Sequence, residues 1–310
     1  MHWLTNLHNP GMSTLIMINP HAAGGRARRL LLPLDGWLTS LGLAHKPDIV
    51  IPESLLQAHQ AIAKRPHRSR IVVVGGDGTL NQMLPSLIRG EHALGLVPYG
   101  SGNDCARAWG LHKLSWQDAL AFALDGNTSA IDVGCVQLNH SERHYFHSSL
   151  AVGFDASVGN RALAGPKFLR GLPRYLLATL RELLHLRNWP IRVKANGEVM
   201  HEGNCLLAST LNTPTYGGGM PAVPHALVND GQLNLLVGGR FNRLQTLLML
   251  PRLLIGKHLG HRRIHCLAFK EATLTCPEPV PVAADGESLG MATHLQISLL
   301  PEALQVVKKT

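Results

Sequence analysis

The chain has 310 residues, more than one compact core usually contains, so its length predicts about two domains. Hydrophobic residues make up 45% and charged residues 16% of the chain, a balance that excludes an intrinsically disordered protein. The formal net charge of +9 favours binding to phosphate groups, whether on nucleotides, lipid head groups or nucleic acid. Aromatic residues are only 5%, and no basic arm or recognition motif is present, so nucleic-acid binding is not expected.

Cysteine spacing and hydropathy limit the cellular context. The five cysteines lie far apart without a C-x-x-C pair, which predicts free thiols in a reducing cytoplasm. The N-terminus has no signal-peptide pattern. The most apolar stretch, 244–255, is interrupted by Gln245, Pro251 and Arg252 and is too short to span a bilayer. Any membrane contact is therefore expected to be peripheral.

Three short apolar runs in the first 100 residues each end in a turn rich in small residues, followed by a helical pattern. We expect strands at 14–18, 71–74 and 93–97. The first and third helices are expected to begin near Arg26 and Cys105, and the second follows Thr79. A repeated strand–turn–helix pattern is typical of an open parallel sheet covered by helices. Because ligands bind at the carboxyl ends of such strands, the three turns are predicted to converge at one sheet edge.

After about residue 130 the pattern changes to short apolar runs between turn residues, which predicts a β-sandwich of antiparallel strands. The expected strands are 131–136, 145–152, 191–195, 205–210, 233–237 and 273–276, and the expected helices are 174–186 and 244–254. We therefore predict an α/β domain at 1–130 and a β-sandwich domain at 131–294. A tail of about 295–310 is expected to pack back on the first domain.

The strongest local signal is the segment Gly-Gly-Asp-Gly-Thr-Leu-Asn at 75–81. Its glycines allow the main chain to approach phosphate oxygens, and the following helix directs its N-terminal amides toward them. Asp77 would repel a phosphate, so its expected use is through a magnesium ion or as an acid/base group. A tight turn with an N-capping aspartate explains the same pattern without any ligand.

The third turn, Gly-Ser-Gly-Asn-Asp at 100–104, repeats this chemistry. Ser101 offers a hydroxyl donor, and Asn103 and Asp104 can cap a helix or orient a metal-bound water. Two such turns in one sheet favour a nucleotide site. Neither a Walker A loop nor a G-x-G-x-x-G fingerprint is present, which disfavours an ordinary P-loop NTPase or a dehydrogenase.

Together with Asn-Pro at 19–20 and Gly-Gly at 24–25, these turns resemble the diacylglycerol-kinase catalytic domain family. That family includes bacterial lipid kinases, sphingosine kinases and ceramide kinases. The likeness continues through 212–219, 224–231 and Asp-Gly-Glu at 285–287, and it is strongest to the compact bacterial lipid kinases. It implies a two-domain NAD kinase/diacylglycerol kinase-like α/β fold, with a nucleotide-binding parallel-sheet domain, a lipid-binding β-sandwich and an active site between them.

The resemblance also implies ATP and Mg²⁺ as cofactors, and diacylglycerol or a similar lipid alcohol as the partner that is phosphorylated. Magnesium is expected at Asp230, with main-chain oxygens of Leu227 and Gln232. The residues expected to bind ATP are Asn19, Gly24, Gly25, Gly75, Gly76, Asp77, Gly78, Thr79, Asn81, Gly100, Ser101, Asn103 and Asp104.

The resemblance places the proton acceptor in the segment 285–287, with Glu287 favoured over Asp285, and Asp77 completes the candidate catalytic carboxylates. Phosphoryl transfer needs positioning and charge neutralisation, and one carboxylate to take the proton of the attacking hydroxyl. A β-hairpin turn explains the same segment without catalysis.

The segment 167–189 contains Arg170, Arg174, Arg181 and Arg187 among many leucines, which indicates a basic amphipathic helix. Such a helix either lies on an anionic membrane or packs its leucines on the sandwich. We therefore expect a cytoplasmic protein at the inner face of the membrane. Two alternatives to a lipid kinase stay open: an NAD kinase, which shares the Gly-Gly-Asp-Gly motif, and a non-catalytic nucleotide-binding regulator.

Overall fold

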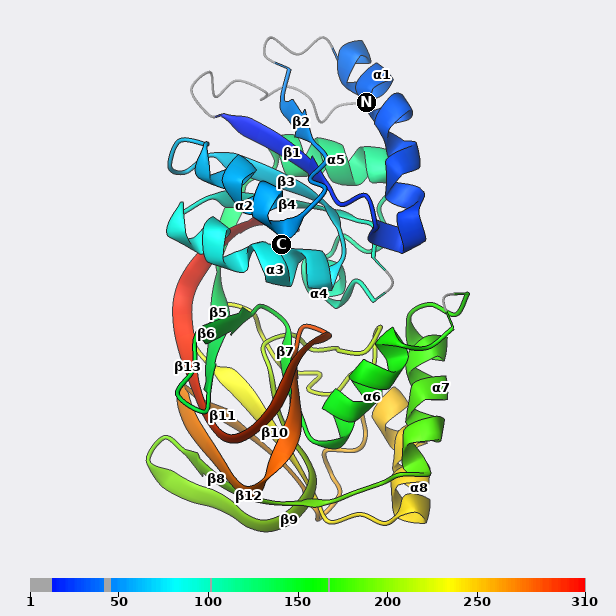
Figure 1. Cartoon of the computed structure of the whole chain (residues 1–310), viewed down its shortest axis with the longest axis vertical. Helices are drawn as coiled ribbons and strands as arrows, with labels where there is room; N and C mark the ends of the chain where they lie inside the picture. Colours follow the sequence, from blue (N-terminus) through cyan, green and yellow to red (C-terminus); the bar gives the residue numbers. More distant parts are fainter. Residues whose placement is uncertain (1–12, 42–45, 101, 167, 310) are drawn as a thin grey trace. The chain divides into compact units, whose positions relative to one another are not determined.

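The computed structural model describes residues 13–41, 46–100, 102–166 and 168–309 (Figure 1). The chain forms two compact units. The first contains the described residues up to Ile131 and those from Ala303 onward, and the second contains the described residues of Asp132–Glu302. Two strands, β5 (Thr128–Leu138) and β13 (Glu287–Val307), run from one unit into the other. The division lies one residue from the predicted limit at 130, and the returning tail begins later than 295. What each unit binds stays a prediction.

The first unit is built on a parallel sheet in the order β4-β3-β1-β2. Its last neighbour is the end of β13, where Gln305 and Val306 pair in parallel with β4. The end of β13 therefore extends the sheet whose first strand in chain order is β1. The strands are β1 (Thr14–Ile18), β2 (Asp48–Val50), β3 (Arg70–Gly75) and β4 (Ala93–Pro98).

Both faces of this sheet are covered, which explains why its strands are continuous apolar runs. Ile16 and Val72 pack against helices on one face, while the alternate residues Met17 and Val73 are fully buried on the other. The helix predicted near Arg26 begins earlier, as a 3-10 helix that starts at Ala22 and includes Gly24 and Gly25 of the expected first turn. The helical elements are η1 (Ala22–Leu30), α1 (Leu31–Ser40), α2 (Leu55–Ala63), α3 (Asp77–Arg89), α4 (Asp104–Ala108) and α5 (Trp116–Asp125).

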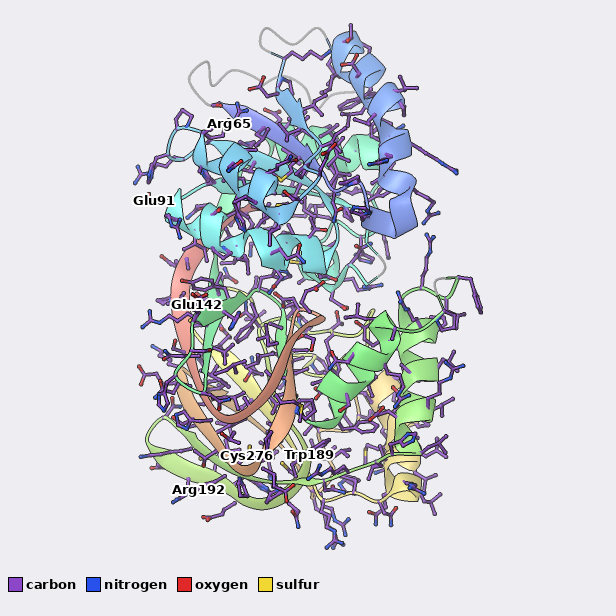
Figure 2. The ribbon with its side chains drawn as sticks, viewed as in Figure 1. Arg65, Glu91, Glu142, Trp189, Arg192 and Cys276 are labelled. Carbon is purple, nitrogen blue, oxygen red and sulfur yellow. The ribbon has the colours of Figure 1, made fainter. Side chains whose placement is uncertain are left out.

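The second unit is the predicted β-sandwich, with antiparallel pairing around β9 and β12. Its core contains Trp189 and Cys276, which are 5% and 7% exposed (Figure 2). Besides β5 and β13, its strands are β6 (Arg143–Phe146), β7 (Ser149–Val152), β8 (Trp189–Ala195), β9 (Glu198–Leu211), β10 (Leu233–Gly239), β11 (Ile264–Phe269) and β12 (Glu271–Ala284). Its helices are α6 (Phe154–Leu163), α7 (Leu172–Leu183) and α8 (Arg243–Leu254).

One predicted strand is wrong. The apolar run 145–152 does not form a single strand, because β6 ends at Phe146 and β7 begins at Ser149. Between them, the main-chain N–H groups of His147 and Ser148 donate to the carboxylate of Asp285. The break in the strand is therefore a feature of the candidate site.

Two further sequence expectations can be compared with the structure. All five cysteines are free thiols, as their spacing predicts. Across the described ranges, no helix combines the length and the apolar character needed to cross a membrane.

Candidate active site

The three turns of the first unit do meet at one edge of its sheet, as predicted. Strands β1, β3 and β4 are parallel neighbours, so their carboxyl ends lie together. Asn19 follows β1, and its main-chain N–H donates to the Val74 carbonyl at 3.1 Å. Its side-chain amide donates to the Thr79 hydroxyl in the first turn of α3 at 2.7 Å. The first turn is thereby fixed to the second.

The second and third turns touch each other through their glycines. A Cβ atom added to Gly76 would lie 2.7 Å from the Cα atom of Gly100, and one added to Gly100 would lie 2.6 Å from that of Gly76. The N–H of Tyr99 donates to the Gly75 carbonyl at 2.7 Å. These two glycines are therefore required for the packing of one turn on the other, whatever else they bind.

The first turn differs, because its glycines face open space. Gly24 and Gly25 have φ of +69° and +87°, in the left-handed region that side chains other than glycine rarely adopt. A Cβ atom on Gly25 would meet nothing closer than 4.0 Å. Arg28 and Arg29, in the last turn of η1, are exposed, so this turn joins accessible main chain to positive charge. Both features suit a polyphosphate.

Asp77 links the second turn to the third. One of its carboxylate oxygens accepts the N–H of Asp104 and the other accepts the N–H of Cys105, each at 3.1 Å. These groups are the unpaired donors at the start of α4, so Asp77 caps a helix other than its own. The expected cap of its own helix is therefore wrong, because the N-cap of α3 is Gly76 without a side-chain hydrogen bond, and any part of Asp77 in acid/base or magnesium chemistry stays a prediction.

The other residues expected to bind the nucleotide have different surroundings. Asn103, at φ +54°, accepts the Gly100 N–H through its side chain at 2.9 Å, which closes the third turn. Asp104 is 6% exposed and lies 3.4 Å from the Arg107 guanidinium. Gly78 and Asn81 lie in the first turns of α3, while Ser101 falls outside the described residues.

In the second unit, Asp285 and Gly286 form a two-residue hairpin turn between β12 and β13. Their φ values of +47° and +88° and the pairing of Ala284 with Glu287 are those of a type I′ turn. The hairpin interpretation is thus correct, and it does not exclude catalysis, because the turn places two acidic residues side by side.

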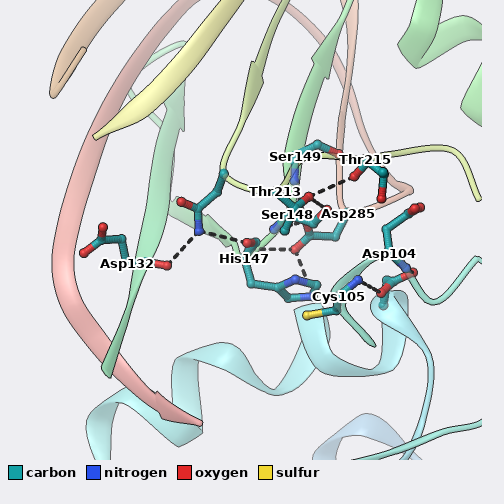
Figure 3. Close-up of polar contacts among 11 residues, drawn as sticks. Asp104, Cys105, Asp132, His147, Ser148, Ser149, Thr213, Thr215 and Asp285 are labelled. Atoms are coloured by element: carbon teal, nitrogen blue, oxygen red, sulfur yellow. Dashed lines mark hydrogen bonds and ion pairs between the residues drawn. The ribbon is translucent and has the colours of Figure 1, made fainter. Parts of the chain in front are cut away.

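The Asp285 side chain is buried and engaged by main-chain donors (Figure 3). It accepts the N–H of His147 at 2.9 Å, of Ser148 at 2.8 Å and of Ser149 at 2.9 Å. The His147 ring nitrogen lies 3.4 Å from the same carboxylate, and both side chains are fully buried. Asp285 therefore holds the break between β6 and β7 in place.

Glu287 has the opposite character. It is half-buried, and within the described part of the chain its carboxylate has no hydrogen bond or ion pair. Burial raises the pKa of Glu287 above its usual value, and the neighbouring charge of Asp285 raises the pKa further. A carboxylate with a raised pKa and unoccupied oxygens is suited to accept a proton, whereas the oxygens of Asp285 are committed to the backbone.

Further residues around the hairpin were given no role by the sequence. The Ser148 hydroxyl lies 2.7 Å from the Thr213 hydroxyl, and the Asn212 side chain donates to the His147 carbonyl at 3.0 Å. The phenol oxygen of Tyr175, on α7, would lie 3.7 Å from a Cβ atom on Gly286. The motif at 212–219 signals Asn212 and Thr213, but nothing local marks His147, Ser148 or Tyr175.

The loop expected to bind magnesium is organised by a buried aspartate that sequence reasoning missed. Asp132, 1% exposed, accepts the N–H of Gly231 at 2.8 Å and of Glu302 at 2.9 Å. Asp230 itself is exposed and accepts the Gln232 N–H at 3.1 Å. No group of three or more His, Cys, Asp or Glu suited to a metal occurs among the described residues. The expected magnesium ligands are one carboxylate and two main-chain oxygens, so the absence of such a side-chain cluster does not test them. The magnesium site stays a prediction.

Comparison with known proteins identifies the family. The model of the diacylglycerol kinase catalytic domain matches residues 13–136, and that of the YegS C-terminal NAD kinase beta sandwich-like domain matches 148–308. A protein named diacylglycerol kinase from Mycobacterium tuberculosis is 33% identical over 297 residues, covering 92% of this chain and 95% of that protein. A probable YegS-like lipid kinase from an Enterobacter species is 30% identical over 246 residues, 76% of each chain.

Solved structures agree on the fold. A putative diacylglycerol kinase from Bacillus anthracis superposes with a TM-score of 0.74 at 22% identity, covering 96% of this chain and 95% of that one. An NAD kinase from Archaeoglobus fulgidus gives a TM-score of 0.52 at 12% identity, covering 95% and 93%. These likenesses concern the fold alone. With the family models and the sequence relatives, they establish that the chain belongs to the diacylglycerol kinase catalytic domain family, in the branch of the bacterial lipid kinases.

Proposed function

We propose that this protein transfers the γ-phosphoryl group of ATP, with Mg²⁺, to a hydroxyl of diacylglycerol or a similar lipid alcohol. The observation that carries the proposal is the pair of carboxylates on the hairpin of the second unit. Asp285 is fixed by three main-chain donors, and Glu287 is left with a raised pKa and no partner in the described chain. One carboxylate that positions and one that accepts a proton are what hydroxyl phosphorylation needs.

ATP binding is assigned to the turns of the first unit. Gly24 and Gly25 offer accessible main chain, and the N-terminal turn of α3 directs amide groups outward at the same sheet edge. Asp77 keeps the third turn in register with the second. The residues proposed to contact ATP are those expected from the sequence, from Asn19 to Asp104.

Proton acceptance is assigned to Glu287. As the lipid hydroxyl oxygen forms a bond to the γ-phosphorus, its proton passes to a Glu287 oxygen, and the bond from the γ-phosphorus to the bridging oxygen of ADP breaks. Asp285 acts as a positioning residue, because its contacts with the segment 147–149 fix the hairpin that carries Glu287.

The oxygen donors at Asp230, Leu227 and Gln232 fit a hard divalent cation, since one carboxylate and two carbonyls are ligands that magnesium accepts. Asp230 is exposed, so its second oxygen is accessible. A cation bound there would supply local positive charge and rigidity to the loop that Asp132 already anchors. As a kinase of membrane lipids, the protein would work from the cytoplasm as a peripheral partner of the inner membrane face, with no nucleic acid involved.

The test is transfer of label from [γ-³²P]ATP to a panel of lipid alcohols, with NAD in a parallel reaction. We expect label in a lipid product that requires Mg²⁺, and no label in NAD. Glu287→Gln should remove the transfer while ATP still binds. Glu198→Gln, an exposed glutamate at the start of β9, is the matched control and should behave as the wild type. Label in NAD alone would establish the NAD kinase alternative, and ATP binding without transfer to any acceptor would favour a regulator.

A further inference from the structure

Helix α8 carries an apolar stripe on the face that it turns to solvent. Leu244 and Leu248 are 63% and 65% exposed, and Ile255, directly after the helix, is 65% exposed. Residues four and seven positions apart lie on the same side of an α-helix, so these side chains form one row. Leu247 and Leu254, 43% and 36% exposed, widen it.

The opposite side of α8 holds the helix on the second unit. Thr246 is buried, and Met249 and Leu253 pack against hydrophobic clusters of the unit. Asn242 and Gln245 form a capping box at the N-terminus. A helix that is apolar on all sides is normally covered on all sides. Within the described residues nothing covers this stripe, so its partner is sought outside the chain.

The charges on α8 and on the residues that flank it in the sequence are all of one sign. Residues 240–263 contain six Lys or Arg and no Asp or Glu, so this short segment contributes +6 to the net charge of +9. Arg243 and Arg252 are exposed at the two ends of the helix, and Lys257 follows it. The Arg243 guanidinium donates to a main-chain carbonyl, that of Leu184 at 2.8 Å, which leaves its positive charge unneutralised.

The bond from Arg243 to Leu184 also joins the C-terminal end of α7 to this surface, and the two helices run side by side in Figure 1. Leu184 is 65% exposed and Leu180, one turn earlier, is 49% exposed. The segment 167–189, for which the sequence leaves both membrane contact and packing on the sandwich open, thus contributes Leu180 and Leu184 to this surface, and α8 supplies most of its exposed apolar side chains.

We propose that the α8 face docks on a bilayer that contains anionic lipids. The α8 face is defined as the stripe on α8, Leu180 and Leu184, with the flanking Arg243, Arg252 and Lys257. Its leucines would enter the boundary between head groups and acyl chains, and its cations would meet lipid phosphates. A symmetric pair of copies joined through this face would place like charges together, which argues against self-association. The proposal rests on the peripheral membrane association of the proposed function and assigns it to one surface, and it uses no transfer chemistry.

The first test is sedimentation with phosphatidylcholine vesicles that contain phosphatidylglycerol. The wild type should bind, and Leu244→Glu/Leu248→Glu should bind at least about tenfold more weakly, because the row would no longer be apolar. Leu32→Glu is the matched control, since Leu32 is 89% exposed on α1 of the first unit. It should bind as the wild type does. Circular dichroism of each variant verifies folding.

The second test separates charge from apolar contact. Arg252→Gln/Lys257→Gln should weaken binding to anionic vesicles by about fivefold for each charge removed, and raised salt should mimic the loss. Binding to vesicles of phosphatidylcholine alone should not change. Lys64→Gln, an exposed lysine at the end of α2, is the control for charge and should have no such effect.

Three outcomes would overturn the proposal. The first two are that the wild type does not bind anionic vesicles, or that the double glutamate variant binds them as tightly as the wild type. The third is a wild-type dimer that this variant converts to monomer without altered vesicle binding. Light scattering measures the last. Transfer to a water-soluble short-chain lipid alcohol separates the two proposals. The double glutamate variant should keep that activity and lose activity on vesicles, whereas docking without transfer by the wild type would refute the kinase proposal alone.

Discussion

Each unit contains a turn of the candidate site with an aspartate that accepts main-chain N–H groups, but the two turns differ in the groups that they leave available to a ligand. In the first unit, Asp77 accepts two N–H groups and fixes α4 to the second turn. In the second, Asp285 accepts three and fixes the segment 147–149. Beside Asp77, the groups left available to a ligand are main-chain groups at glycines. Beside Asp285, the available group is the carboxylate of Glu287.

This difference distinguishes two roles of an acidic residue next to glycine, ordering a loop and transferring a proton. A carboxylate whose oxygens accept N–H groups orders a loop, and its removal disturbs structure before it disturbs chemistry. A half-buried carboxylate without such donors is a candidate for proton transfer. On this criterion, Glu287 is separated from Asp77 and Asp285, although all three are acidic residues in turns.

The largest expected effect is that of Glu287→Ala on turnover. Loss of the proposed proton acceptor should reduce kcat by about 10² to 10⁴-fold, with ATP affinity nearly unchanged, because the proposed ATP contacts lie in the first unit. Steady-state kinetics with a lipid acceptor and ATP binding by calorimetry measure the two quantities. Normal turnover would move the base to another residue.

Asp285→Ala should have the largest effect on stability. Three buried N–H groups would lose their acceptor, which should lower the free energy of unfolding by about 3 to 5 kcal/mol. Urea denaturation at neutral pH measures this change. Asp230→Ala is the control, since the exposed Asp230 should alter stability by less than about 0.5 kcal/mol. Similar small losses for both variants would contradict the positioning role of Asp285.

The sequence predicts much of the first unit because its signals are local. The runs at 14–18, 71–74 and 93–97 are buried on both faces, and each is followed at once by its turn. The hydropathy of each strand and the turn residues next to it in the sequence therefore predict the same structure. The break at His147 and Ser148 was missed because it depends on Asp285, 137 positions from Ser148. Local hydropathy favours a continuous strand there, and only the tertiary contact decides otherwise.

The same reason explains the partial success at the candidate site. The hairpin at 285–287 has a local signature, Asp-Gly, and so does the turn at 75–81. The acceptor of the Asp104 and Cys105 N–H groups is 27 and 28 positions away, and the Gly231 N–H reaches Asp132 across 99. Spacing identifies turns, but it does not reveal which carboxylate each turn engages.

Asp77→Ala should have a smaller effect that separates capping from ligand binding. Loss of the α4 cap should lower stability by about 1 kcal/mol and weaken ATP binding, because the third turn would no longer be fixed to the second. Ser115→Ala is a matched control, since Ser115 caps α5 by accepting the Asp118 N–H at 3.1 Å. It should reduce stability by a similar amount without altering ATP affinity. Equal ATP affinity in both variants would show that the turn does not contact the nucleotide.

The finest test concerns the charge that Asp285 places beside Glu287. The base acts when deprotonated, so kcat/KM should fall as pH decreases through the pKa of Glu287, which burial and Asp285 both raise. Asp285→Asn removes the negative charge while keeping a similar shape. The pKa of Glu287 should therefore decrease, and the acid limb of the kcat/KM profile should move to lower pH. A purely structural role of Asp285 would lower the rate at every pH and leave the limb in place. An unmoved limb in a folded, active variant would therefore contradict an effect of the Asp285 charge on the titrating base.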